Sequence, residues 1–348
     1  MPAKAGAVTM QQVAECAGVS MMTVSRVLND DARVRESTRI KVMRAVAALG
    51  YRPNISARSL AGARSYLLGL LYANPSAAYI SELLIGALKS CRAAGYHLVV
   101  ESCDMEEAAI GEQMLALAKE SRLDGLILPP PLCESAPLMA ALEAARIPYV
   151  RIAPFTRLDA APYVCIDDAA AARDITARLI ALGHRRIGFI KGHPNQGASR
   201  LRLQGFQDAM QAAGLRSARR DICQGYFSYK SGLRCAEKLL NRADRPTAIF
   251  ASNDDMAAAV YAVAHRHGLD IPQDLSVVGF DDTLIATTLW PPLTTVRQPI
   301  AAIAGAAVEL LTTNRRAAAV LRQPAAPRRL LDYAIVERQS TAPPTTPD

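Results

Sequence analysis

The chain begins with apolar residues at helical spacing. Positions 10, 13, 14 and 17 are apolar and lie behind Thr9, which forms a capping-box pattern with Gln12. Gly18 stands where the chain must turn, and Ser20 is placed to cap a second helix. The first thirty residues therefore predict two short helices joined by a tight turn.

The second of these helices has two different faces. Val24, Val27 and Leu28 point one way, and a third helix follows that ends at Gly50. Such a pair with an exposed face fits the major groove of DNA, although an ordinary helical hairpin has the same pattern. The opposite, exposed face carries Met21, Met22, Ser25, Arg26 and Asn29.

From Tyr66 onward, short apolar runs alternate with longer amphipathic stretches. This alternation predicts parallel sheets with helices on both faces, and two series of strands predict two lobes. Segments 292–300 and 328–338 are expected to complete one lobe each. The expected strands are 65–72, 96–102, 124–130 and 147–154 in the first series, and 163–167, 185–192, 247–253 and 274–282 in the second.

Positive charge is concentrated at the N-terminal end. Residues 1–64 hold ten Lys or Arg against four Asp or Glu, which is +6 of the total net charge of +8. A basic module on a nearly neutral body is what contact with nucleic-acid phosphates requires. This concentration favours the DNA-binding interpretation over a plain helical hairpin.

These motifs resemble those of the lac repressor family of bacterial transcription regulators. The resemblance rests on SMMTVSRVLN, GYRPN and the hinge SLAG, and it continues through nearly the whole chain. It implies an α/β fold with an N-terminal helix-turn-helix domain and a two-lobed core like a type I periplasmic binding protein. The expected domains are 1–50 for DNA binding, 51–63 for the hinge and 64–340 for the core, with a disordered tail over 341–348. The first lobe is expected over 64–162 and 293–320, and the second over 163–292 and 321–340.

The resemblance also implies how DNA is bound. The second helix reads the major groove, and Leu60 of the hinge wedges into the minor groove, where unstacking bends the duplex. Arg26 is the expected guanine contact, and the two methionines offer apolar contact to thymine methyl groups. The residues expected at DNA are Thr9, Ser20, Met21, Met22, Thr23, Ser25, Arg26, Asn29, Tyr51, Asn54, Ala57 and Leu60.

A small-molecule site is expected in the cleft between the lobes. Ligands bind beyond the carboxyl ends of parallel strands, where acidic and amide side chains follow several of the apolar runs. Carboxylates and an arginine together can bind the neighbouring hydroxyls of a polyol. The expected effector contacts, partly from the resemblance, are Asn74, Arg202, Phe227, Asn253, Asp281 and Gln298. Ala170 stands where some sugar-responsive members carry an acid, so Asp167 or Asp168 is left to compensate.

Other chemistries find little support in the sequence. The seven cysteines lie apart, and neither they nor the histidines have metal-ligand spacing, so no metal, cofactor or disulfide framework is expected. No GxSxG, P-loop or HExxH motif occurs, and an enzyme is not expected. The N-terminus lacks the apolar run of a signal peptide and no run suits a membrane span, so a cytoplasmic protein is expected.

The sequence therefore predicts a DNA-binding regulator, most simply a repressor of carbohydrate genes. Its partners are expected to be a pseudo-palindromic operator and a sugar or sugar phosphate. A homodimer is expected, because the tail after Gln339 has no apolar heptads and cannot form the helical bundle that makes some family members tetramers. A regulator that responds to a purine or another non-sugar ligand remains an alternative. So does a sugar-binding protein without a DNA role.

Overall fold

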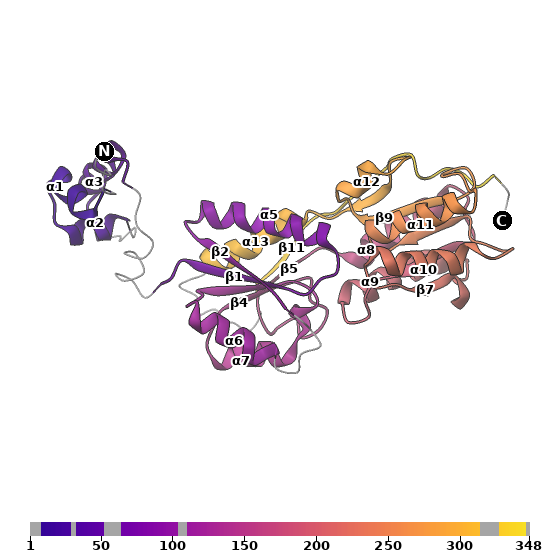
Figure 1. Ribbon diagram of the computed structural model, residues 1–348, viewed down its shortest axis with the longest axis horizontal. Helices are drawn as coiled ribbons and strands as arrows, with labels where there is room; N and C mark the ends of the chain where they lie inside the picture. The colour runs from indigo at the N-terminus through magenta and orange to yellow at the C-terminus, as the bar shows by residue number, and fades with distance from the viewer. Residues whose placement is uncertain (1–7, 29–32, 52–63, 104–109, 314–326, 346–348) are drawn as a thin grey trace, which may run out of the picture. The chain divides into compact units, whose positions relative to one another are not determined.

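The computed structural model describes residues 8–28, 33–51, 64–103, 110–313 and 327–345 (Figure 1). Contacts divide the chain into two units, Met1–Tyr66 and Leu67–Asp348. Within the described residues, no helix is both long and apolar enough to span a membrane.

The described residues of the N-terminal unit form three helices, as predicted. They are α1 (Met10–Ala17), α2 (Met21–Leu28) and α3 (Glu36–Leu49). Thr9 and Gln12 form both bonds of the capping box, and Gly18 ends α1 in the left-handed conformation. The hydroxyl of Ser20 accepts from the Thr23 amide at 3.2 Å and so caps α2. These local bonds set the turn between α1 and α2.

The first lobe is built on a six-stranded sheet in the order β11-β5-β4-β3-β1-β2. Helices α5 (Ala77–Ala93) and α13 (Ile300–Thr313) pack together on one side of it, and α6 (Ile110–Glu120) and α7 (Ala136–Ala144) on the other (Figure 1). All its strand pairs are parallel, which explains the continuous apolar runs. The strands are β1 (Leu67–Tyr72), β2 (His97–Ser102), β3 (Gly125–Leu128), β4 (Tyr149–Ile152), β5 (Tyr163–Cys165) and β11 (Arg328–Leu330).

The second lobe repeats this plan in the order β12-β10-β9-β8-β6-β7. Its one antiparallel pair joins β10 to β12. Helices α8 and α9 pack together, as do α10 and α11. The strands are β6 (Ile187–Lys191), β7 (Ile222–Gln224), β8 (Ala248–Ala251), β9 (Ser276–Asp281), β10 (Thr294–Arg297) and β12 (Ala334–Val336). The helices are α8 (Asp168–Ala181), α9 (Gly197–Ala212), α10 (Tyr229–Leu240), α11 (Asp254–Arg266) and the short α12 (Leu284–Thr288).

The observed lobe boundaries correct the expected ones. Strand β5, expected to open the second lobe, pairs with β4 of the first, and β10, expected in the first lobe, pairs with β9 of the second. Strand β11, expected in the second lobe, pairs with β5. These strands have only three or four residues, so their apolar pattern cannot specify which sheet they join.

Strand β7 and helix α10 were not predicted. Strand β7 is a half-buried edge strand of three residues and therefore has no apolar run to mark it. Helix α10, in contrast, has a clear stripe of buried residues that includes Cys235 and Leu239, and this stripe is the signal in the sequence that marks it. The two elements pack against each other.

The expected disordered tail is wrong for the described residues 341–345. The Ala342 amide donates to the hydroxyl of Ser276 at 3.0 Å, and its carbonyl lies 2.9 Å from the His184 ring nitrogen. His184 is buried and also contacts Thr247 and Ser276. These hydrogen bonds satisfy buried polar groups, and they order a segment whose composition alone indicates disorder.

Candidate functional site

The exposed face of α2 is the first candidate site. Met21 and Met22 are 52% and 64% exposed, whereas Val24 and Val27 are buried between the helices. Arg26 is exposed in the last turn of the same helix. Large apolar side chains exposed beside an arginine are suited to contact a partner.

Not every expected DNA contact lies on this face. Tyr51 is only 6% exposed and packs in the core of the three helices, and its contact to DNA stays a prediction. Its burial follows from the turn at Gly50, which brings the Tyr51 amide to the Val46 carbonyl. Asn29, Asn54, Ala57 and Leu60 lie outside the described residues.

The second candidate site is a pocket between the lobes. All six expected effector contacts line it, and so do several residues that were not expected. The space open to a water molecule between these side chains is about 30 Å³. A ligand as large as a sugar therefore requires the lobes to open or the side chains to move. The lining is Asn74, Ser76, Tyr79, Pro130, Ala153, Asp168, Gln196, Ala198, Arg202, Phe227, Asn253, Asp281 and Gln298.

Arg202 of α9 lies at the centre of this pocket. Its Nε donates to Asp168 at 2.8 Å and its Nη1 to the Ser252 carbonyl at 2.6 Å, while Asp281 lies 3.8 Å away. The guanidinium also lies 3.5 Å from the centre of the Phe280 ring. This buried arginine offers its charge to two carboxylates at once.

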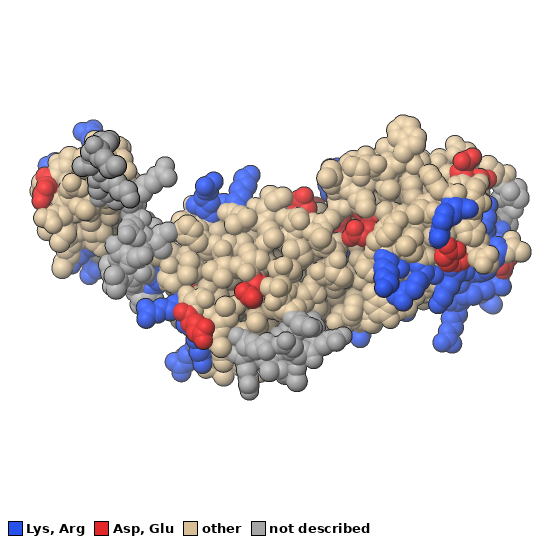
Figure 2. All heavy atoms as spheres, viewed as in Figure 1, with Lys and Arg blue, Asp and Glu red and all other residues tan. Residues whose placement is uncertain are grey.

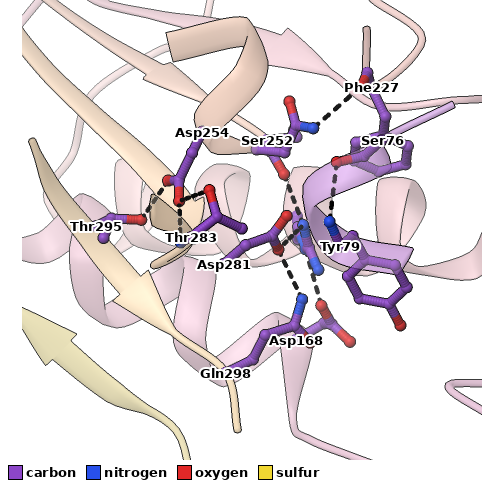
Figure 3. A network of polar contacts seen from close by, with 12 residues as sticks. Ser76, Tyr79, Asp168, Phe227, Ser252, Asp254, Asp281, Thr283, Thr295 and Gln298 are labelled. Carbon is purple, nitrogen blue, oxygen red and sulfur yellow. Dashed lines mark hydrogen bonds and ion pairs between the residues drawn. The ribbon is translucent and has the colours of Figure 1, made fainter. Parts of the chain in front are cut away.

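Asp281 is presented from the end of β9 in an unusual backbone conformation. Its φ is 116°, and the neighbouring Asp282 has a φ of 58°, a region that side chains other than glycine rarely adopt. Gln298 donates to Asp281 at 2.6 Å (Figure 3). Burial raises the pKa of the Asp281 carboxyl well above its usual range, although the Arg202 charge opposes this. Backbone strain of this kind collects at ligand clamps.

Asp254 forms a support beneath the pocket. It starts α11 and accepts from Thr283 and Thr295, which lie after β9 and in β10 (Figure 3). Burial raises the pKa of its carboxyl to about 7, and the threonine hydrogen bonds limit the rise.

This pKa predicts how stability depends on pH. The folded chain keeps a proton on Asp254 that the unfolded chain releases above pH 3.8, so the free energy of unfolding should fall between about pH 4 and pH 7. In Asp254→Asn, we expect that fall to be smaller by about 2 to 4 kcal/mol. Urea unfolding between about pH 4 and pH 7 measures this free energy for both chains. Asp208→Asn, at an exposed position, is the control. An unchanged pH profile in Asp254→Asn would contradict the assignment.

Two contacts hold the lobes together around the pocket. The hydroxyl of Ser76, in the first lobe, donates to Asp255 of α11 at 2.6 Å. Gly197, at the start of α9, lies against Phe155 of the first lobe so closely that an added Cβ would be 2.2 Å from the Phe155 Cβ. The close approach needs a glycine at this position.

Gly197→Ala is therefore expected to hold the lobes apart. Small-angle scattering should show a larger radius of gyration than for the unchanged chain. Adding Phe155→Ala removes the opposing atoms and should restore the closed dimension. Failure of this second change to restore it would show that the contact does not limit closure.

Two pocket residues lie where the chain crosses between the lobes. Asp168 follows the crossing from β5 into α8, and Gln298 lies on the crossing from β10 into α13. A third crossing joins β11 to β12. A ligand that contacts these two side chains acts directly on hinge segments.

Several pocket residues also have structural roles. Asn253 caps α11 through the Met256 amide at 3.0 Å and donates to the Phe227 carbonyl at 3.1 Å. Asn74 accepts from the Ser76 amide at 2.9 Å. Both side chains line the pocket while they fix its walls.

Sequence reasoning missed Tyr79 and Gln196. Tyr79 lies on the buried face of α5, and the N-cap position of Gln196 before α9 was the signal available for it. Asp168, left as one of two alternatives, pairs with Arg202, whereas Asp167 caps α8.

Comparison with known proteins matches two parts of the chain to known families. Residues 9–54 match the model of bacterial regulatory proteins of the lacI family, and residues 176–341 match a periplasmic binding protein-like domain. The chain is 35% identical to the ribose operon repressor of Escherichia coli (strain K12), over 87% of this chain and 92% of that protein. The chain belongs to the LacI family. It is therefore a DNA-binding transcriptional regulator with an effector-binding core, and not an enzyme.

Solved structures of LacI-family regulators agree. A complex of the transcriptional regulator CelR with cellobiose has a TM-score of 0.72 and 30% identity, covering 96% of this chain and 99% of that one. The lac repressor dimer bound to operator and an anti-inducer has a TM-score of 0.74 and 28% identity, covering 97% and 99%. The likeness extends over both the helix-turn-helix unit and the two-lobed core.

Proposed function

We propose that this regulator represses genes of carbohydrate uptake or catabolism and is controlled by a neutral sugar in the interlobe pocket. The observation that carries the proposal is Arg202 held between Asp168 and Asp281 in a buried pocket. The arginine can donate hydrogen bonds and the two carboxylates can accept them. This arrangement suits the adjacent hydroxyls of a sugar, because each hydroxyl both donates and accepts. The ring of Phe227, buried at the same pocket, offers an apolar face to a pyranose.

The charge of the pocket favours a neutral sugar over a sugar phosphate. Arg202 is the one cation in the lining, and Asp168 and Asp281 both lie in that lining. Asp254 and Asp255 are close enough to Asp281 to raise the pKa of its carboxyl, so the pocket already holds more acidic groups than its one cation balances. A phosphate would bring further negative charge to a site with no free positive partner among the lining residues.

On the DNA side, the proposal assigns one half of a pseudo-palindromic operator to each subunit of a homodimer. Exposed apolar side chains support self-association of the core. Ile85 and Leu88 are 56% and 51% exposed on α5, and Leu284 and Trp290 are 77% and 79% exposed at α12. Both helices lie along the upper side of the core in Figure 1. A symmetric dimer would bury such patches against their copies.

The double change Leu284→Ser, Trp290→Ser is expected to weaken this dimer. Sedimentation equilibrium should show the unchanged chain as a dimer and the variant shifted toward monomer by at least about tenfold in dissociation constant. Leu158→Ser, which removes an exposed leucine elsewhere in the core, is the matched control. A variant as dimeric as the unchanged chain would place the interface elsewhere.

A thermal-shift screen of neutral sugars, sugar phosphates and nucleobases tests the ligand class. A neutral sugar that binds should raise the melting temperature by mass action, and its phosphate ester should bind more weakly. A hit only among nucleobases or only among sugar phosphates would overturn the proposed effector.

Binding to duplex DNA tests the regulatory role. The whole chain should bind a sequence selected from a random pool, with an affinity that falls as salt rises and changes when the sugar is added. Deletion of residues 1–63 should abolish this binding while the sugar response of the melting temperature remains. Retained DNA binding in the deletion variant would contradict the assignment.

The proposed sugar acts by changing the angle between the lobes. Because Asp168 and Gln298 lie on crossing segments, closure on a ligand would turn the first lobe of each subunit relative to the second. A coupling of about 1 to 3 kcal/mol between the sites would be enough to change operator occupancy.

A further inference from the structure

The second lobe contains a pair of cysteines that the pocket does not use. Cys223 lies in the edge strand β7 and is half-buried, whereas Cys235 lies on α10 and is 3% exposed. The Cys235 thiol donates to the carbonyl of Gln224, the residue after Cys223, at 3.3 Å, and Cys223 packs against the buried cluster that contains Cys235. The two cysteines therefore lie close together where β7 packs against α10.

The surroundings of this pair are basic. Residues 183–245 hold thirteen Lys or Arg against four Asp or Glu, so the small net charge of the core is unevenly distributed. Figure 2 shows these basic side chains gathered over the end of the core where β7 and α10 lie in Figure 1. The charges of Lys238 and Arg242 lower the pKa of the Cys223 thiol, and the charge of Asp221 opposes them.

These contacts favour the thiolate at Cys223. The hydrogen bond from Cys235 and then the charges of Lys238 and Arg242 lower the pKa of the Cys223 thiol to about 7, although partial burial opposes them. Cys165 is also half-buried, but burial raises the pKa of its thiol. A thiolate at neutral pH is the reactive form of cysteine.

We infer that Cys223 and Cys235 form a peroxide-sensitive dithiol that closes into a reversible disulfide. The Cys223 thiolate attacks a hydroperoxide, so that an S–O bond forms, the O–O bond breaks and the leaving oxygen takes up a proton as water or an alcohol. The Cys235 sulfur then attacks the sulfenic sulfur, an S–S bond forms, and the sulfenic oxygen leaves as water with the Cys235 proton. The two sulfurs lose two electrons in total, and the peroxide gains them.

This disulfide would constrain a wall of the pocket. The segment between the two cysteines contains Phe227, whose ring lies against Gly192 and whose backbone has a φ of 57°. Gln224, next to Cys223, donates to the Gly192 carbonyl at 2.7 Å. Drawing the sulfurs to bonding distance, about 2.05 Å, moves β7 relative to α10 and so acts on the segment that carries Phe227.

A peptide map of the full-length chain tests the dithiol directly. Reduced protein is treated with hydrogen peroxide at neutral pH, alkylated and cut with trypsin, which is expected to release residues 221–230 and 235–238 as separate peptides. The expected product is these two peptides joined and two hydrogens lighter than their sum. It should form at least about tenfold faster than Cys165 is oxidised, and dithiothreitol should reverse it.

Variants separate the two chemical steps. In Cys235→Ser, a sulfenic acid should persist at Cys223 and be trapped by dimedone, whereas Cys223→Ser should leave Cys235 unoxidised. Peroxide that oxidises Cys223 no faster than Cys165, or that gives no joined peptide, would overturn the inference. The unchanged chain carries this test even if a variant folds poorly.

The effect on the pocket wall is measured without any ligand. Hydrogen exchange of the segment around Phe227 should slow by at least about threefold on oxidation and recover on reduction. A joined peptide with unchanged exchange would refute the constraint on Phe227. This result is independent of whether the pocket binds a sugar.

Discussion

Replacing Arg202 with methionine is expected to abolish sugar binding and to destabilise the core by about 3 to 5 kcal/mol. The guanidinium is 5% exposed and is held by Asp168, the Ser252 carbonyl and the Phe280 ring. Without it, two buried carboxyl groups lose their positive partner, and the pocket loses the donor proposed for sugar hydroxyls.

Two measurements follow this change. Urea unfolding gives the stability loss, and the sugar-induced rise in melting temperature gives binding, which we expect to fall by more than a hundredfold. Arg216→Met removes an exposed arginine just after the same helix and should change neither quantity by more than about 0.5 kcal/mol. A full sugar response in Arg202→Met would remove Arg202 from the proposed ligand contacts.

Arg26→Ala is expected to reduce the affinity for the selected operator by about 1 to 3 kcal/mol and to relax the preference for one base pair. Arg26 projects from the exposed face of α2, between the methionines and the end of the helix. Arginine can donate two hydrogen bonds to guanine, and alanine cannot.

The control separates charge from sequence reading. Arg44→Ala removes an exposed positive charge from α3 and should weaken specific and non-specific binding about equally. Competition with random DNA measures both affinities for each variant. If Arg26→Ala lost specific and non-specific affinity equally, Arg26 would contact the DNA phosphates and not a base.

The N-terminal helices could be predicted because their ends are fixed by neighbouring residues. Thr9 and Gln12 bond to each other's backbone, and Gly18 adopts the left-handed conformation that ends α1. Such signals lie within a few positions of sequence and need no tertiary contact. The burial of Tyr51 depends on the packing of all three helices, which the local pattern does not contain.

The pocket could be predicted in part for a related reason. Asp281 is the last residue of the buried strand β9 and Asn253 lies just after the buried strand β8, so the parallel topology brings both to one edge of the sheet. Tyr79 comes from the buried face of a helix, where the sequence pattern of an aromatic residue indicates a place in the hydrophobic core. The sheet membership of β5 and β10 could not be predicted. The sheet that a strand of three or four residues joins is decided by its tertiary contacts, and the strand's own sequence does not contain them.

The position of Asp168 and Gln298 on crossing segments has a consequence for engineering this regulator. Substitutions there would alter ligand preference and the resting angle of the lobes together, so a variant selected for a new ligand could lose its response. Phe227 and Asn74 face the same pocket from other loops. Changes of specificity should therefore begin at these two positions, where recognition can be varied while the moving joint keeps its native residues.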